Sequence, residues 1–206
     1  MIKPTLDFEV SLWAKGVNFI CGIDEVGRGS WAGPLVAAGV ILPRGFVLPE
    51  LLADSKLLNS AQRLKVGNIV KKQALSFSIA QVAPGLIDKI GLTKATSMAF
   101  RNVVKGLTIK PDFCLVDAFY IKHFDKKKQQ PIIHGDRLCA SIAAASIIAK
   151  VYRDNLMKKL HFQHPQYGFS RHKGYGTKFH QQAILKYGFL KIHRHSYNFN
   201  FLITSE

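Results

Sequence analysis

The fold is decided by residues 20–42, which read ICGIDEVGRGSWAGPLVAAGVIL. An apolar, β-branched run ends on the adjacent carboxylates Asp24 and Glu25, passes through the turn Gly27-Arg28-Gly29, and resumes as a second apolar run. We therefore expect a strand with an acidic end, a tight loop and a second strand. Hard carboxylate oxygens suit Mg²⁺ or Mn²⁺, and the arginine offers a planar cationic fork for phosphate. This stretch predicts phosphate chemistry.

The composition predicts a globular protein with a polyanionic partner. The chain has 206 residues, of which 48% are hydrophobic and 20% charged, enough for one full core with or without a small appendage. The 29 Lys and Arg residues outnumber the 13 Asp and Glu residues, giving a net charge of +16. That excess favours nucleic acid over a membrane as the partner, although a solvated basic surface without a partner is the alternative.

The basic excess is concentrated in the C-terminal part. Residues 1–120 carry 14 basic and 9 acidic side chains, whereas residues 121–206 carry 15 and 4 together with all eight histidines. We therefore expect the C-terminal part to clamp a sugar-phosphate backbone.

The cysteines and the N-terminus indicate a cytoplasmic protein. Cys21, Cys114 and Cys139 are far apart and lie in apolar stretches, so we expect buried reduced thiols without a disulfide or zinc site. The sequence shows neither a secretion signal nor an apolar run of about 18 residues, so we expect no membrane span.

Periodicity predicts an α/β protein. Its first half reads as a β-meander with a helical insertion. We expect strands at residues 18–24, up to 42, 75–82, 113–117 and 131–136, and helices at 60–74, 86–105, 138–160 and 177–187.

Three of these strands end on acidic residues. If the strands are neighbours, Asp24, Glu25, Asp117 and Asp136 converge on one patch, where they would repel one another unless cations neutralise them. Two divalent ions about 4 Å apart would clamp the attacking and leaving oxygens of a phosphodiester displacement. Adjacent strand residues point to opposite faces, so either the strand bends at Gly27 or Glu25 reaches around the edge.

Other readings of the acids are weaker. A single acid at a strand end is best explained as a solvated cap, but three such strand ends favour a site. Asp154 is a rival fourth ligand, yet a helix over residues 138–160 would separate it from Asp136, so a structural ion pair is the better explanation. Asp54 reads as a turn former beside Lys56, which could reach a phosphate.

The motifs resemble those of the type 2 ribonuclease H family, the bacterial ribonucleases HII. The resemblance runs in the family's order over residues 23–175. It rests on IDEVGRG at 23–29, DSKL at 54–57, LVD at 115–117, GD at 135–136, SIAAASIIAKVYRD at 141–154, YGF at 167–169 and HKGY at 172–175.

The resemblance implies a ribonuclease H-like fold, a mixed five-stranded sheet flanked by helices with a small C-terminal helical extension. Residues 1–160 would be the catalytic domain and residues 161–206 the basic substrate-binding extension. It implies an endonuclease that cuts the RNA strand of RNA–DNA hybrids and nicks duplex DNA 5′ of single ribonucleotides. We expect it to act as a monomer and to leave 3′-hydroxyl and 5′-phosphate ends.

The family's site residues fall on specific positions of this chain. The catalytic carboxylates would be Asp24, Glu25, Asp117 and Asp136, with Asp24 bridging two Mg²⁺ or Mn²⁺ ions. The turn residues Gly27, Arg28 and Gly29 would contact the ribonucleotide 2′-hydroxyl and adjoining phosphates, the 2′-hydroxyl being what separates RNA from DNA. The tyrosine that stacks at the ribose-to-deoxyribose junction best matches Tyr175, with Tyr167 as the alternative and a core aromatic as the competing explanation.

Two rival functions explain part of the sequence. A non-catalytic nucleic-acid-binding module explains the charge of +16 but not the clustered acids. Another nuclease of the same fold, such as a resolvase or exonuclease, explains the carboxylates, but the turn Gly27-Arg28-Gly29 argues against it.

Overall fold

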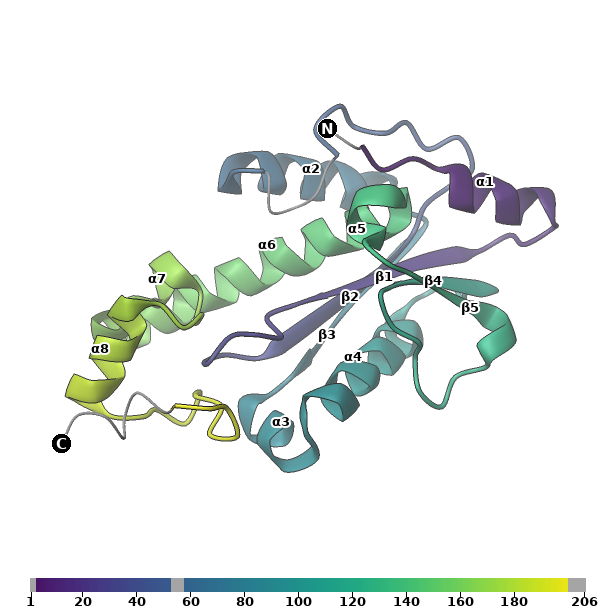
Figure 1. The fold of residues 1–206 in the computed structure, drawn as a ribbon. Coiled ribbons are helices and arrows are strands. Elements are labelled where there is room, and N and C mark those ends of the chain that lie inside the picture. The colour runs from purple at the N-terminus through teal and green to yellow at the C-terminus, as the bar shows by residue number, and fades with distance from the viewer. Residues whose placement is uncertain (1–2, 53–57, 200–206) are drawn as a thin grey trace.

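A mixed β-sheet forms the centre of the protein (Figure 1). The computed structural model describes residues 3–52 and 58–199. The five strands of the sheet lie in the order β3-β2-β1-β4-β5, with β1–β2 and β2–β3 antiparallel and β1–β4 and β4–β5 parallel. Their bounds are β1 Ile20–Val26, β2 Leu35–Ile41, β3 Ser76–Val82, β4 Phe113–Asp117 and β5 Gln129–Ile132. The predicted mixed five-stranded sheet and the β-meander at its start are confirmed.

Helices cover both faces of the sheet and pack closely against its two central strands. Helix α6, Ala140–Gln163, packs on one face, where a Cβ on Gly22 of β1 would lie 2.2 Å from the carbonyl carbon of Ser141. Helix α4, Leu92–Gly106, packs on the other, where a Cβ on Gly39 of β2 would lie 2.4 Å from Val103 Cγ1. The small residues of the two central strands therefore allow the helices to approach closely.

Each face has its own apolar core. Helix α2, Ser60–Gln73, joins α6 over one face and starts with the capping box of Asn59 and Gln62. Helix α4 and Ile87 of α3, Pro84–Ile90, close the other core. Helix α1, Asp7–Ala14, forms in the first part of the chain, for which the sequence predicted no element. The three cysteines are buried and free, as predicted.

Gly91 divides the helix that the sequence predicts over residues 86–105. It adopts φ +80° and separates α3 from α4. The apolar spacing continues across the break, which is why periodicity alone joined the two helices.

The strand predicted over 131–136 was placed too late in the chain. The strand β5 ends at Ile132, and Asp136 lies instead in the short helix α5, Gly135–Leu138. The chain leaves the extended conformation at His134, whose φ is +57°. Asp136 therefore reaches the sheet edge from a helix rather than from a strand end.

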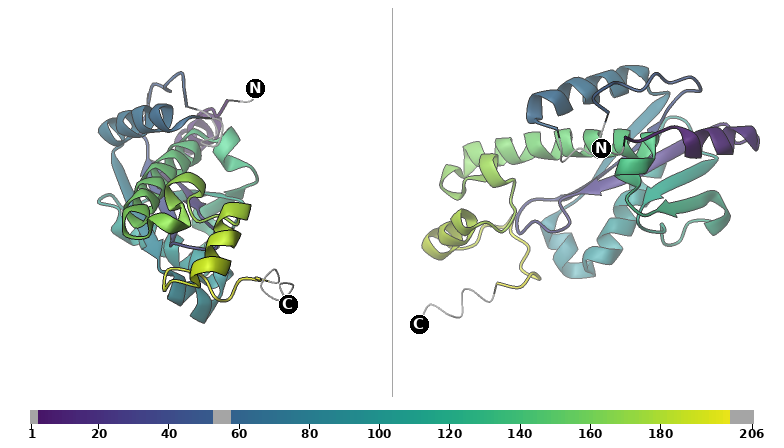
Figure 2. Two further views of the ribbon diagram at one scale, coloured as in Figure 1. Left: turned by 90° about the vertical axis from the view of Figure 1, so that its left-hand side faces the viewer. Right: turned by 45° about the horizontal axis from the view of Figure 1, so that its top comes forward.

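The C-terminal helices gather at the far end of α6, and the following chain passes the β1–β2 turn (Figures 1 and 2). Their apolar contacts form a separate cluster that includes Ala32, Met157, Phe169 and Ile184. The elements are η1 Lys126–Lys128 before β5, and η2 Pro165–Tyr167, α7 Phe169–His172 and α8 Lys178–Tyr187 after α6. Among the residues described, no helix has the length and apolar character needed to cross a membrane. The predicted division at residue 160 stays a prediction.

Candidate active site

The four predicted carboxylates border one cavity of about 570 Å³ at the carboxyl ends of β1 and β4. Its lining combines acids, bases and one aromatic ring. The lining residues are Asp24, Glu25, Val26, Arg63, Asp117, Asp136, Ser146, Lys150 and Tyr175. The convergence expected from the sequence is therefore present, and an anion-rich wall faces two cationic side chains.

Glu25 reaches the cavity from a regular strand. The pairing of β1 with β2 continues without a bulge through Glu25 opposite Ala37 and Val26 opposite Val36. Because neighbouring strand residues point to opposite faces, Glu25 must reach around the strand from the side opposite Asp24. Its carboxylate lies 3.6 Å from the guanidinium of Arg28. Of the two possibilities left by the sequence, the structure favours the second.

The buried acids destabilise one another's charged forms. Burial raises the pKa of Asp24 well above its usual value, and the charges of Glu25 and Asp117 raise it further, against a hydrogen bond from the Ser146 hydroxyl. Burial likewise raises the pKa of Glu25 to about 7, although Arg28 beside it lowers it. Carboxylates so arranged are stabilised by added positive charge.

A backbone hydrogen bond joins Asp117 to the segment that carries Asp136. The amide of Gly135 donates to Asp117 Oδ1 at 2.8 Å. The bond fixes the start of α5 at the end of β4, and Asp136 follows as the next residue. This contact explains how an acid on a helix joins acids on strands.

Asp154 is the structural ion pair that the sequence favoured. Lys150 Nζ lies 2.7 Å from Asp154 Oδ1, and Arg63 Nη2 lies 3.6 Å from Oδ2. Ser146, Lys150 and Asp154 are four residues apart along α6, so they share one helix face. The sequence did not identify Ser146 or Lys150 as residues of the cavity, although both lie in the motif at 141–154. The four-residue spacing was the signal.

A buried arginine supports the turn Gly27-Arg28-Gly29 from behind. Arg153 of α6 is fully buried, and its guanidinium donates to Ser30 Oγ at 2.7 Å. Gly27 has φ +87°, and a Cβ there would lie 2.2 Å from Arg153 Nε. Both the backbone conformation and the lack of space therefore require glycine at this position. Arg153 also donates to the carbonyls of Pro34, Lys173 and Ala32, at 3.0, 2.9 and 3.1 Å.

A second buried arginine supports the same turn from the C-terminal segment. Arg194 donates to the carbonyl of Arg28 at 2.7 Å and to that of Gly33 at 2.9 and 3.1 Å. The hydroxyl of Tyr197 also donates to the carbonyl of Arg28. Neither Arg153 nor Arg194 was identified from the sequence.

Tyr175 lies at the cavity, and Tyr167 does not. The Tyr175 ring is 37% exposed, and its backbone forms a β-bridge with Ser30 beside the turn. Tyr167 is 1% exposed, and its hydroxyl donates to the carbonyl of Gly188 at 2.7 Å, so its ring is part of the core and Tyr175 remains the better candidate. Gly29 is exposed at the tip of the turn. Lys56, the remaining predicted contact, lies outside the described residues.

The carboxylate oxygens suit divalent cations, but their side chains are not yet arranged as the ligands of an ion. The described residues contain no group of three or more His, Cys, Asp or Glu side chains already placed to hold an ion. Asp117 Oδ1 is engaged with Gly135, and Asp24 Oδ1 accepts from the Glu25 amide at 2.6 Å. Glu25 Oε2 is buried without a hydrogen-bond partner, as expected of an oxygen that lacks a cationic ligand. The donor set therefore fits divalent cations once side chains reorient.

Comparison with known proteins gives a consistent result over most of the chain. A family model described as Ribonuclease HII matches residues 21–200. A ribonuclease HII of Syntrophus aciditrophicus is 46% identical over 190 residues, which cover 92% of this chain and 89% of that protein.

Two crystal structures share the fold. Ribonuclease H2 from Pyrococcus horikoshii superposes with a TM-score of 0.73 at 25% identity, covering 87% of this chain and 94% of that one. Bst-RNase HIII, crystallised in complex with Mn²⁺, superposes with a TM-score of 0.66 at 16% identity, covering 88% of this chain and 67% of that one.

Proposed function

The chain belongs to the ribonuclease HII family and is a ribonuclease H, and we propose that it both cuts the RNA strand of RNA–DNA hybrids and nicks duplex DNA 5′ of single embedded ribonucleotides. The reaction is hydrolysis of a phosphodiester. The products are a 3′-hydroxyl and a 5′-phosphate.

The observation that carries this proposal is the crowding of acids at one cavity. Asp24 and Glu25 are buried beside Asp117, and the pKa values of Asp24 and Glu25 are raised by burial and by that proximity. In a protein that only bound nucleic acid, negative charge facing the phosphates would lower the affinity. A hydrolase that recruits divalent cations uses that charge.

Asp24, Glu25, Asp117 and Asp136 would hold the cations through their oxygens, as the donor chemistry of the cavity allows. When bound, two Mg²⁺ or Mn²⁺ ions supply an activated water for in-line attack and stabilise charge on the departing oxygen. A ribonuclease HIII of the same fold has been crystallised with Mn²⁺.

The remaining predicted residues would bind and discriminate the substrate. Gly27, Arg28 and Gly29 would read the 2′-hydroxyl and the adjoining phosphates, on a turn that the buried arginines hold in place. Tyr175 would pack on the sugar at the ribose-to-deoxyribose junction, and Lys56 would contact a phosphate. Residues 161–206 would extend this surface along the backbone.

The experiment is cleavage of an end-labelled DNA duplex that contains one ribonucleotide. It is run with Mg²⁺, with Mn²⁺ and with chelator, beside an all-DNA duplex of the same sequence. We expect metal-dependent nicking on the 5′ side of the ribonucleotide and no cut in the control.

Each other outcome identifies a different function. Binding that is insensitive to chelator, without nicking, would make the chain a nucleic-acid-binding module. Nicking of both duplexes would keep the cations but overturn the reading of the 2′-hydroxyl.

A further inference from the structure

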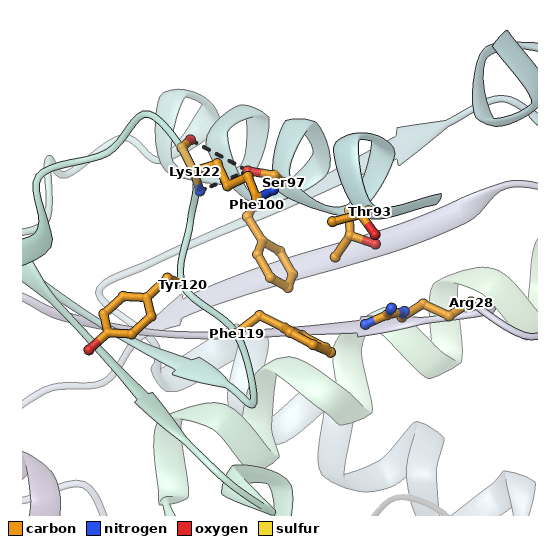
Figure 3. A pocket seen from close by; sticks show the side chains of 8 residues that line it. Arg28, Thr93, Ser97, Phe100, Phe119, Tyr120 and Lys122 are labelled. Atoms are coloured by element: carbon orange, nitrogen blue, oxygen red, sulfur yellow. Dashed lines mark hydrogen bonds between the residues drawn. The ribbon is translucent and has the colours of Figure 1, made fainter. Parts of the chain in front are cut away.

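A second cavity is linked to the carboxylate cavity by the ion pair between Arg28, which lines the second cavity, and Glu25, which lines the first. Figure 3 shows the residues that line the second cavity. Its volume is about 220 Å³, and α4 and the loop after β4 form its walls. Its lining residues are Arg28, Thr93, Thr96, Ser97, Phe100, Phe119, Tyr120 and Lys122. Because Arg28 also pairs with Glu25, this cavity begins where the carboxylate cavity ends.

The ring of Phe119 is held at the cavity by the backbone that follows Asp117. The residue between them, Ala118, has φ +55°, and the Phe119 amide donates to the Asp117 carbonyl at 2.6 Å. Phe119 remains 43% exposed. A tight turn therefore presents a large apolar ring to solvent directly beside a proposed catalytic acid. Burying that ring in the core would have been the more favourable use of its apolar surface.

Arg28 lies over this ring. Its guanidinium carbon is 4.4 Å from the centroid of the Phe119 ring, and Figure 3 shows the guanidinium pointing toward that ring. At this distance a cation–π contact holds the guanidinium without using all of its N–H groups. Those N–H groups remain available to a phosphate oxygen.

A similar pair of arginine and ring borders the carboxylate cavity itself. The guanidinium carbon of Arg153 is 5.6 Å from the centroid of the Tyr175 ring, which lines the carboxylate cavity. The two neighbouring cavities thus each contain a half-exposed ring next to an arginine. Such rings offer an apolar face to sugars and bases, and Arg28, unlike the buried Arg153, also offers charge to phosphates.

The rest of the cavity suits a sugar-phosphate unit. Exposed Thr93 offers a hydroxyl, and Lys122 offers an ammonium group. The backbone amide of Lys122 donates a hydrogen bond to Ser97 Oγ at 2.9 Å, which fixes the loop at this point. An adjoining pocket that shares Lys122 is lined by Lys94 and Arg101 as well. In a duplex the bases are paired, so the groups that reach a side pocket are sugars and phosphates.

We propose that the cavity of Phe119 and Arg28 is a nucleic-acid subsite that seats one sugar-phosphate unit of the cleaved strand next to the scissile phosphate. The Phe119 ring packs against the sugar, and Arg28, Thr93 and Lys122 face the phosphate. The assignment to the cleaved strand follows from the 3.6 Å contact between Arg28 and Glu25. This subsite rests on the proposed function and adds a second ring contact to that of Tyr175.

The test combines variants of Phe119 with a scan of neutral phosphates. Duplexes that contain one ribonucleotide carry a methylphosphonate at successive positions around the cleavage site, and both equilibrium binding with chelator and kcat/KM are measured. We expect Phe119→Ala to weaken binding about tenfold, a loss typical of one stacked contact. Phe119→Tyr, which keeps the ring, should stay within about twofold of the unchanged protein.

The scan locates the contact. One methylphosphonate position should weaken binding to the unchanged protein and weaken it much less in Phe119→Ala, because losing the ring releases Arg28 from its position. Phe77→Ala is the matched control, because Phe77 is also a half-exposed ring beside a cation: it is 38% exposed, and Lys71 Nζ lies 5.8 Å from its ring centroid. Phe77 belongs to β3, the edge strand on the other side of the sheet. That variant should bind every duplex as the unchanged protein does.

Two results would overturn the subsite. One is unchanged binding by Phe119→Ala. The other is a loss that is equal at every methylphosphonate position and accompanied by a lower melting temperature, which would make Phe119 a structural residue only. If the unchanged protein binds these duplexes but cuts none, the proposed function fails while the binding scan still tests the subsite.

Discussion

Two groups of buried charge face each other across the turn Gly27-Arg28-Gly29, and they are stabilised in opposite ways. Behind the turn, Arg153 and Arg194 are fully buried, yet carbonyl and hydroxyl oxygens accept their N–H groups. In front of it, Asp24 and Glu25 lie close to Asp117, and Glu25 Oε2 has no hydrogen-bond partner.

The difference teaches where this molecule keeps its binding capacity. Backbone carbonyls can satisfy a buried guanidinium, so the arginines complete the fold without any ligand. The crowded carboxylates are stabilised only in part, because Arg28, Ser146 and the Gly135 amide contact them while the neighbouring acids raise the pKa of Asp24 and Glu25. Partly stabilised charge lies on the side of the turn that we propose to be reactive, and fully hydrogen-bonded charge lies on the side that supports the turn.

The largest effect is expected from neutralising a carboxylate. Asp117→Asn should lower kcat at least about a thousandfold, since several kcal/mol of transition-state stabilisation by the cations depend on the acid ligands. With chelator, its melting temperature should equal or exceed that of the unchanged protein, because Asp117 raises the pKa of both Asp24 and Glu25. Cleavage assays and thermal unfolding of the same preparation check both parts. Full activity in this variant would remove Asp117 from the site.

The opposite behaviour is expected behind the turn. Arg153→Met leaves Ser30 Oγ and the carbonyls of Pro34, Ala32 and Lys173 without their donor. Each buried acceptor left unpaired costs about 1–3 kcal/mol, so the free energy of unfolding should fall by at least about 3 kcal/mol. Urea unfolding measures it, with Arg44→Met as the control, because Arg44 donates to Asn18 in an exposed contact. A loss no larger than that of the control would contradict the supporting role.

The pKa of Glu25, raised to about 7, makes the stability of the metal-free protein depend on pH. The folded protein holds this proton up to about pH 7, whereas the unfolded chain releases it near 4.5, the ordinary value for glutamate. Glu25 should therefore make the unchanged protein lose stability, relative to Glu25→Gln, as the pH rises from about 5 to about 7. His180 and His193, whose pKa values burial lowers to about 4, act in the opposite direction in both proteins. The measurement is the melting temperature against pH with chelator.

Two comparisons sharpen this test. Glu25→Gln should remove the contribution of Glu25 to the pH dependence, because its carboxyl group is gone. Saturating Mn²⁺ should raise the melting temperature more at pH 8 than at pH 5.5, since cations bind the deprotonated carboxylates. A melting-temperature difference between Glu25→Gln and the unchanged protein that stays constant from pH 5 to pH 7 in chelator would contradict the destabilising environment assigned to Glu25.

Most of the sheet and the four acids could be predicted from the sequence, because strands with apolar runs and acidic ends are local patterns. The strand over 113–117 agrees with β4 to the residue. The position of Asp136 was not predictable in the same way, since a left-handed residue at His134 starts a short helix that periodicity does not reveal. The break at Gly91 was missed for the same reason.

The support of the turn was beyond the sequence. Arg194 Nη1 reaches the carbonyl of Arg28, a residue 166 positions earlier, and such a contact depends on tertiary packing alone. The subsite at Phe119 depends likewise on a turn that brings loop and helix together. Local patterns locate charge, but they do not say which charges the fold satisfies.

The smallest effect is expected at Asp154, which tests the comparison with the same chemical change as Asp117→Asn. Asp154 is an acid near the cavity whose charge Lys150 and Arg63 satisfy. Asp154→Asn should lower the free energy of unfolding by about 1 kcal/mol, as for an ion pair with partial exposure, and leave kcat within about threefold. A loss of activity as large as that of Asp117→Asn would show that satisfied acids also take part in the reaction. The two variants, measured side by side, thus distinguish an acid that stabilises the fold, Asp154, from an acid that we propose to bind cations, Asp117.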